Sequence, residues 1–203
     1  MYLTKTPWWL RALYPSLVWR MPAEEKKIYL SFDDGPHPVA TPFVLDRLAE
    51  YGAKASFFCI GKNVAAQPAI YQRILAEGHT VGNHTHEHVN GWKTTDEDYV
   101  TDTMTAATYI QSDLFRPPYG RIKRSQIKLL REKGMKIMMW DVLSADFDTN
   151  LTAQACLSYV LYHTKPGSIV LFHDSEKAWE RMSVALPAVL KHFSREGYVF
   201  DRI

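Results

Sequence analysis

The segment KIYLSFDDGP, residues 27–36, joins an apolar run to two adjacent carboxylates and a Gly-Pro turn. Residues 27–32 have the β-branched and aromatic content of a strand, and this run stops at Asp33 and Asp34. Parallel sheets present their chemistry where the strands end, so we expect both acids at a functional edge. Neighbouring strand residues point to opposite sides, which predicts different roles for the two carboxylates. An Asp before Gly-Pro is also common in turns. Turn formation would explain the presence of one acid here, but it explains the presence of two poorly.

Strand-like and helix-like segments alternate from this segment to the end of the chain. Apolar and β-branched runs predict strands over residues 27–32, 55–60, 80–83, 114–116, 135–142, 168–173 and 198–203. Amphipathic runs with capping residues at their ends predict helices over residues 41–51, 70–77, 95–111, 125–133, 152–163 and 179–196. Repeated βα units with apolar strands predict parallel pairing, with helices outside the sheet. About seven such units in a single domain predict an α/β fold, a distorted and incomplete (β/α)7 barrel with mostly parallel strands.

Residues 1–26 precede this pattern, and we expect them to form an N-terminal arm packed on the domain of residues 27–203. The arm is aromatic and basic, with Trp8 and Trp9 among its residues. Two prolines break its uncharged stretches, so it fits neither a secretory signal peptide nor a transmembrane helix. An interfacial membrane anchor is the alternative, because Trp and Arg favour that zone. The cellular location stays open between cytoplasmic and membrane-peripheral.

The composition is that of one globular domain. With 203 residues, of which 46% are hydrophobic, the chain can bury a substantial core. Its formal net charge is only +2 and no long Lys/Arg block occurs, so no nucleic-acid partner is expected. Cys59 and Cys156 lie far apart and fit no metal or redox spacing. Nothing in the composition indicates an oligomeric state.

Polar residues follow five of the predicted strands. In barrels of parallel strands the active site lies at the C-terminal ends of the strands. We therefore expect one site to collect these runs, which are Asp33-Asp34, His84–His88, Arg116–Tyr119, Asp141–Asp148 and His173-Asp174.

The run His84-Thr85-His86-Glu87-His88 contains two histidines four residues apart. Residues at this spacing face the same way on a helical turn, so His84 and His88 could bind one ion. Solvated loop histidines are as common, and His86 fits that description. A carboxylate from another strand end would complete an Asp-His-His set, which is typical of a catalytic zinc-like site. The expected cofactor is a divalent metal, zinc first, with cobalt, nickel or manganese as alternatives.

Two further groups could move protons at such a site. If one acid of the Asp33-Asp34 pair binds the metal, the other is free to take a proton from water. His173 follows another strand and is a suitable proton donor to a leaving group. The alternative for His173 is a structural histidine, hydrogen-bonded to the backbone at a strand end.

These motifs together resemble the polysaccharide deacetylases of carbohydrate esterase family four, the NodB-homology domain. The resemblance covers residues 27–203 and is carried by four motifs in order, Ser31–Pro36, His84–His88, Arg116–Tyr119 and Leu171–His173. The family's fourth motif, Asp-x-x-Asp followed by Trp or Tyr, departs here. Leu143 stands at its first Asp and Phe147 at its aromatic position, while Asp146 keeps the last Asp.

The resemblance implies roles for the residues of the first three motifs. Asp34, His84 and His88 would bind the metal. Asp33 would be the general base, and Arg116 would orient it and keep it ionised.

The resemblance also implies how the amide would be held and protonated. The backbone N–H of Tyr119 would help to hold the oxyanion. His173 would be the general acid, kept cationic by Asp146. The residues that would line the substrate pocket are Trp140, Leu171 and Pro118.

The implied function is a metal-dependent hydrolase that removes N-acetyl groups from amino sugars in a chitin- or peptidoglycan-type glycan and releases acetate. One alternative is a hydrolase of another small or cyclic amide on the same scaffold. A second alternative is a catalytically silent carbohydrate-binding domain. The complete set of metal, base and acid residues argues against a silent domain, because sugar binding alone does not need them.

Overall fold

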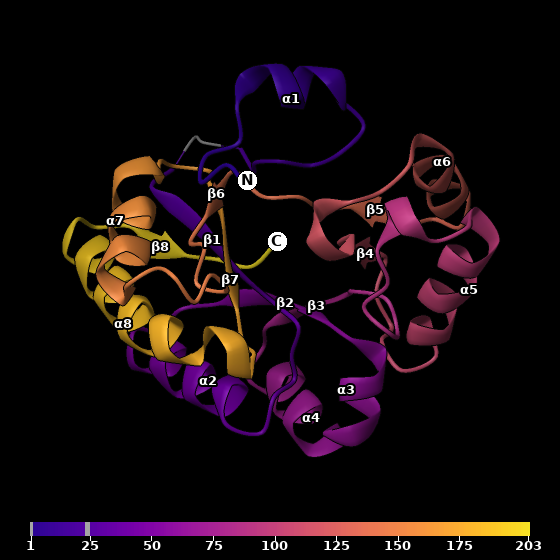
Figure 1. Cartoon of the computed structure of the whole chain (residues 1–203). Helices are drawn as coiled ribbons and strands as arrows, with labels where there is room; N and C mark the ends of the chain where they lie inside the picture. Colours follow the sequence, from indigo (N-terminus) through magenta and orange to yellow (C-terminus); the bar gives the residue numbers. More distant parts are fainter. Residues whose placement is uncertain (1, 23–24) are drawn as a thin grey trace.

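The computed structural model describes residues 2–22 and 25–203, which form a curled, parallel sheet surrounded by helices (Figure 1). Each pairing between named strands is parallel, in the order β5-β4-β3-β2-β1-β7-β6, and β8 pairs with the first residues of β1. The strands are β1 (Lys27–Asp33), β2 (Ala55–Cys59), β3 (Thr80–Asn83), β4 (Leu114–Phe115), β5 (Lys136–Ile137), β6 (Val142–Leu143), β7 (Ile169–His173) and β8 (Val199–Phe200). This architecture confirms the predicted α/β fold, an incomplete barrel of parallel strands.

The helices lie outside the sheet, as the repeated βα pattern predicts. They are α1 (Trp8–Leu13), α2 (Ala40–Glu50), α3 (Gly61–Ala66), α4 (Pro68–Ala76), α5 (Asp96–Ala107), α6 (Arg124–Glu132), α7 (Ala153–His163) and α8 (Trp179–Arg195). Short 3₁₀ turns occur at Gly91–Lys93, Pro118–Gly120 and Glu176–Ala178. In the described ranges no helix is both long and apolar enough to cross a bilayer.

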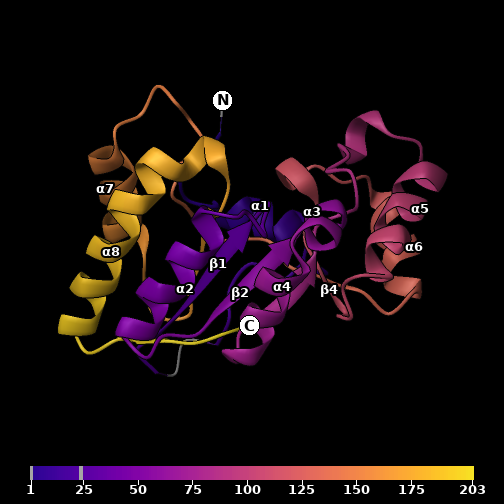
Figure 2. The same ribbon diagram turned by 90° about the horizontal axis from the view of Figure 1, so that it is seen from below.

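The main core lies between the centre of the sheet and its outer helices. Figure 2 shows α2 and α8 side by side next to β1. Phe32 of β1 is fully buried, and its ring stacks on Phe57 of β2 and Phe172 of β7 at centroid distances of 5.1 and 6.1 Å. Because β1 has a neighbour on each side and helices on its outer face, its apolar run is buried along almost its whole length.

The segment before β1 pairs with both open edges of the sheet. On the β6 edge, Thr6 N–H donates to Asp141 O and Leu143 N–H to Thr4 O, both at 2.9 Å. On the β5 edge, Val18 N–H donates to Ile137 O at 3.0 Å. Residues between these contacts carry α1, which stands apart from the other helices (Figure 1). These hydrogen bonds cover backbone groups that an open sheet edge would expose.

The structure differs from the sequence prediction at three places. The single strand expected over 135–142 is two strands, β5 and β6, because the carbonyls of Met138 and Met139 turn to accept the guanidinium of Arg116. Helix α3 follows β2 directly and was not predicted, since its sequence GKNVAA has no helical apolar repeat. Helix α1 was not predicted either, because it is short and lies between two prolines.

Asp141 anchors the N-terminal segment in the domain. Its buried carboxylate accepts Lys5 Nζ and Ser168 Oγ, both at 2.7 Å, and Arg20 Nη1 lies 3.4 Å away. Removing the carboxylate leaves two partly buried cations without their partner.

We therefore predict that Asp141→Ala lowers the free energy of unfolding by about 2–3 kcal/mol, measured by denaturant titration. Asp113→Ala is the matched control, because Asp113 pairs with Lys136 at 2.8 Å but is more than half exposed. Asp113→Ala should lower the free energy of unfolding much less, because exposed ion pairs contribute little to stability. Equal losses for the two variants would contradict the anchoring role of Asp141.

Candidate active site

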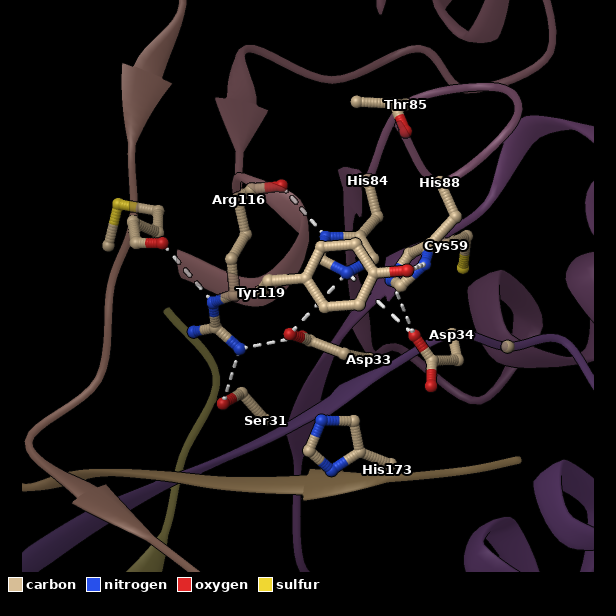
Figure 3. A network of polar contacts seen from close by, with 12 residues as sticks. Ser31, Asp33, Asp34, Cys59, His84, Thr85, His88, Arg116, Tyr119 and His173 are labelled. Atoms are coloured by element: carbon tan, nitrogen blue, oxygen red, sulfur yellow. Dashed lines mark hydrogen bonds and ion pairs between the residues drawn. The ribbon is translucent and has the colours of Figure 1, made fainter. Parts of the chain in front are cut away.

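The carboxyl ends of four strands meet at one site (Figure 3). Asp33 ends β1 and His173 ends β7, and the two residues are direct partners in the parallel register. His84 follows β3, and Arg116 follows β4. The structure thus brings together the polar runs that the sequence places at separate strand ends.

Asp34, His84 and His88 offer one ligand atom each, all within 4.8 Å of one another. Asp34 Oδ1 lies 3.2 Å from His88 Nε2 and 3.8 Å from His84 Nε2. Ligand bonds of about 2.1 Å in a tetrahedral site place neighbouring donor atoms roughly 3.4 Å apart. The spacing of these donors therefore fits a metal site of the predicted Asp-His-His type.

The imidazoles are oriented with Nε2 toward Asp34. His84 Nδ1 lies 2.7 Å from the carbonyl of Arg116, and His88 Nδ1 lies 3.1 Å from Tyr119 Oη. Contacts at Nδ1 fix the ring and leave Nε2 available, which is the usual outer-shell arrangement of metal-binding histidines.

The charges of these groups also suit a cation. Burial lowers the pKa of His84 to about 4, so its ring is neutral at physiological pH. Burial alone would raise the pKa of Asp34, but the hydrogen bond with His88 and the positive charge of His173 hold this pKa well below its ordinary value. A neutral imidazole and an ionised carboxylate are the forms that bind metal.

The histidine run is a loop and not a helical turn, so the helical reading of its spacing was wrong. Thr85 and His88 have φ values of 64° and 58°, in the left-handed region and outside the range of a right-handed helical turn. The loop is held by its own hydrogen bonds, with Thr85 N–H donating to Asn83 Oδ1 at 2.8 Å and His86 N–H to Asp102 Oδ2 at 2.8 Å. A shaped loop brings His84 and His88 together, with their ring centroids 5.1 Å apart.

Asp33 is buried against Arg116. The guanidinium is itself fully buried and donates from Nη1 to Asp33 Oδ1 at 2.8 Å and to Ser31 Oγ at 2.9 Å. Asp33 Oδ2 is left facing the histidines, 3.7 Å from His84 Nε2. One carboxylate oxygen is thus held by a cation while the other faces the site (Figure 3).

The two adjacent acids do not point to opposite sides. Asp34 lies beyond the last residue of β1 and has a φ of 82°, so strand alternation does not apply to it. Both Asp33 and Asp34 therefore come within 4 Å of the same atom, His84 Nε2. Their difference lies in their partners, because Asp33 is held by Arg116 and Asp34 by His88.

His173 forms a pair with Asp146. Its Nδ1 lies 2.7 Å from Asp146 Oδ1, and its backbone N–H donates to Asp146 Oδ2 at 2.9 Å. Burial would lower the pKa of His173, but the charge and hydrogen bond of Asp146 outweigh it and raise the pKa to about 9. The imidazole is therefore protonated at neutral pH, with Nε2 left over for another partner.

The remaining predicted residues lie around a cavity of about 950 Å³ that contains the Asp-His-His cluster. Trp140 and Leu171 line it, together with Leu143 and Phe147 of the altered motif, whereas Pro118 is buried and lies outside its lining. The backbone N–H of Tyr119 donates no hydrogen bond within the described part of the chain.

Sequence reasoning missed several residues that support the site. Asp174 is buried, accepts Gly35 N–H at 3.1 Å and Thr41 Oγ1 at 2.5 Å, and so holds the turn that follows Asp34. A side chain at Gly35 would collide with this carboxylate, which explains the glycine. The adjacency of Asp174 to His173 was a usable signal. Nothing in the sequence pointed to Asn83, because the hydrogen bond that it accepts from Thr85 N–H exists only in the folded loop.

Comparisons with known proteins agree with this geometry. A family model described as polysaccharide deacetylase matches residues 20–138. A peptidoglycan-N-acetylglucosamine deacetylase of Bacillus cereus is 34% identical over 190 residues, covering 91% of this chain and 89% of that protein. A chitooligosaccharide deacetylase of Bradyrhizobium is 34% identical over 165 residues, covering 78% of this chain and 75% of that protein.

A solved structure is similar over almost the full length. The crystal structure of the Bc1960 peptidoglycan N-acetylglucosamine deacetylase, in complex with 4-naphthalen-1-yl-N-oxidanyl-benzamide, matches with a TM-score of 0.89 and 29% identity. The match covers 98% of this chain and 95% of that chain, so most of the N-terminal segment is included.

We predict that the purified protein binds one zinc ion per chain and that His84→Ala abolishes this binding, because the ion loses one of three ligands. Titration calorimetry and metal analysis of the same samples measure it. His86→Ala is the control, since His86 lies in the same loop but outside the cluster and stacks on Tyr109. Retained stoichiometric zinc in His84→Ala would exclude His84 as a ligand.

We also predict a His173 pKa of about 9 in the metal-free protein, followed by NMR of the imidazole resonances. Asp146→Asn should lower this pKa by more than one unit, because burial then acts without its opposing charge. Asp148→Asn, which changes an exposed carboxylate of the same loop, should leave it in place. If Asp146→Asn had no effect, the His173–Asp146 pair would not be what holds the proton.

Proposed function

The chain belongs to the polysaccharide deacetylase family, and on this premise we propose that it is a metal-dependent N-deacetylase of acetylated amino sugars in a glycan. One arrangement carries the proposal. A three-residue metal cluster shares one cavity with a carboxylate held by a buried arginine and with an imidazole held cationic by a second carboxylate. Amide hydrolysis needs this combination, because the attacking water must lose a proton and the amine must gain one.

The metal is assigned to Asp34, His84 and His88. A divalent ion bound there would polarise the acetyl carbonyl and lower the pKa of a bound water. Zinc is the expected ion, since it favours nitrogen and carboxylate ligands in tetrahedral sites with one open position. Cobalt, nickel and manganese accept the same ligands and are the alternatives.

Asp33 acts as the general base. Its Oδ1 is held by Arg116, which leaves Oδ2 to take the proton of the attacking water. Arg116 cannot give up its own proton at working pH, so it positions Asp33 without competing for the proton.

Tyr119 acts on the carbonyl oxygen of the amide, and His173 acts on its nitrogen. The backbone N–H of Tyr119 is offered to the oxyanion that develops on the carbonyl oxygen. His173 donates its Nε2 proton to the departing nitrogen, and Asp146 stabilises the charge before that transfer. Trp140 and Leu171 enclose the acetyl methyl group.

The relatives indicate the substrate class. One name specifies the N-acetylglucosamine of peptidoglycan and the other specifies a chitooligosaccharide. We assign this chain to the same class, a peptidoglycan- or chitin-type glycan with N-acetylated amino sugars. The altered fourth motif places Leu143 and Phe147 in the cavity wall. Because Leu143 stands where the family motif has its first Asp, the wall on that side is more apolar.

We predict that Asp33→Asn lowers the rate of acetate release by at least ~10²–10⁴-fold while zinc content is unchanged, because the base is lost and the ligands are not. The assay uses chitotetraose and peptidoglycan fragments, with zinc measured on the same sample. Glu87→Gln is the control, since Glu87 is an exposed acid in the same region that pairs with Lys62. Full activity of Asp33→Asn would exclude Asp33 as the base.

The substrate class is tested by a panel that adds small linear and cyclic amides to the glycans. Acetate from glycans alone is the expected result. Turnover of the small amides alone would favour a different amide hydrolase. Sugar binding by the zinc-loaded protein without turnover of any substrate would favour a silent carbohydrate-binding domain.

A further inference from the structure

The cavity that contains the metal cluster continues away from it, toward the N-terminal segment. One part of its lining comes from side chains of this segment, from the loop before α6 and from the residues after β5. We name this part the arm lobe and define it by Leu10, Leu13, Leu17, Trp19, Ile122 and Met139. The arm lobe and the metal cluster belong to the same cavity of about 950 Å³.

Trp140 joins the two parts of the cavity. On one side it packs against the apolar cluster that contains Leu17, Trp19 and Met139. On the other side it packs against the cluster of Leu143, Ala145 and Leu171, beside the acetyl pocket. A substrate group that leaves the acetyl pocket along Trp140 therefore enters the arm lobe.

The side chains that define the arm lobe offer few polar groups, and their sequence neighbours Tyr14 and Arg121 also line the cavity. The indole N–H of Trp19 donates to Tyr14 O at 3.2 Å, and the hydroxyl of Thr6 donates to Trp140 O at 2.7 Å. At its rim, the indole N–H of Trp92 donates to Ile122 O at 3.2 Å. Asp33 and Asp34 are the sole carboxylates in the lining of the described cavity, which contains no side-chain amide, and both belong to the catalytic cluster.

This chemistry discriminates between a sugar ring and an apolar group. A buried hydroxyl without a hydrogen-bond partner is destabilising, and a sugar ring carries several hydroxyls. An alkyl or aryl group meets no such cost and gains from leaving water. The aliphatic lining of the lobe thus suits an apolar chain better than a further sugar unit.

The surface outside the lobe is apolar as well. Leu13 is half exposed at the rim, and Trp8 and Trp9 of the same helix are 74% and 52% exposed. Helix α1 therefore continues the apolar surface of the lobe outward, with Arg11 as its one cation. A chain longer than the lobe would still lie on apolar side chains.

We propose that the arm lobe is a binding site for an apolar chain attached to the N-acetylated sugar, so that the preferred substrate is an amphiphilic glycoconjugate. This inference rests on the proposed deacetylase function and names its substrate class more closely. The N-terminal segment then has two roles, since it covers the open edges of the sheet and also forms the wall of this site.

The test compares the methyl and octyl glycosides of N,N′-diacetylchitobiose, both below their micellar concentration. We expect the octyl glycoside to have a KM at least roughly 10-fold lower, because several methylene groups leave water. Acetate release gives KM and kcat. Isothermal titration of zinc-loaded Asp33→Asn gives the two dissociation constants without turnover.

Leu13→Gln is the diagnostic variant, because Leu13 is half exposed and its change should not disturb folding. It should reduce the ratio of the methyl to the octyl KM toward one. Leu75→Gln is the matched control, since Leu75 is an exposed leucine of α4 outside the cavity, and it should leave the ratio unchanged.

The two proposals can fail separately. Equal dissociation constants for the two glycosides would overturn the arm lobe as a chain site, even with active enzyme. A lower KM for chitohexaose that depends on Leu13 would also overturn it, by assigning the lobe to sugars. If neither glycoside released acetate but the octyl glycoside bound more tightly, the deacetylase function would fail and the chain site would stand.

Discussion

The buried guanidinium of Arg116 is the interaction on which the site depends. It is out of contact with water, and a buried charge costs several kcal/mol unless its geometry is satisfied. Its N–H groups donate to Ser31 and Asp33 on β1 and to the carbonyls of Met138 and Met139. Its Cζ atom lies 3.9 Å from the ring centroid of Phe58. Its own carbonyl meets His84 Nδ1. One residue therefore orients the proposed base and a metal ligand together, which couples their positions.

The incomplete barrel creates a second constraint. A sheet that ends at β5 and β6 leaves two edges with unpaired backbone groups. The N-terminal segment meets both edges, through residues 4–6 on one side and Val18 on the other. The chain between these contacts must pass over the gap, and there it forms α1 and the wall of the cavity. The same segment thus covers the edges of the sheet and lines the cavity of the proposed substrate site.

Much of the fold could be predicted because the strands are buried on both faces and are therefore apolar throughout. The central strands and the helices from α4 onward lie close to their predicted positions. The break between β5 and β6 could not be predicted, because it depends on Arg116, which comes from a distant strand end. The left-handed backbone of Asp34 and His88 could not be predicted either, because residues other than glycine rarely adopt this conformation. The predicted metal residues are nevertheless brought together, although by a loop rather than by a helical turn.

The sequence by itself determined which chemical groups stand at which strand ends. Alternating βα units place the carboxyl ends of parallel strands at one edge, so acids and histidines in those positions must converge. Only the tertiary structure decided which atoms meet. The register of β1 on β7 places Asp33 beside His173, and the positive φ of Asp34 turns its carboxylate toward the histidines. These contacts join residues far apart in the chain, and their distances depend on packing that no local pattern encodes.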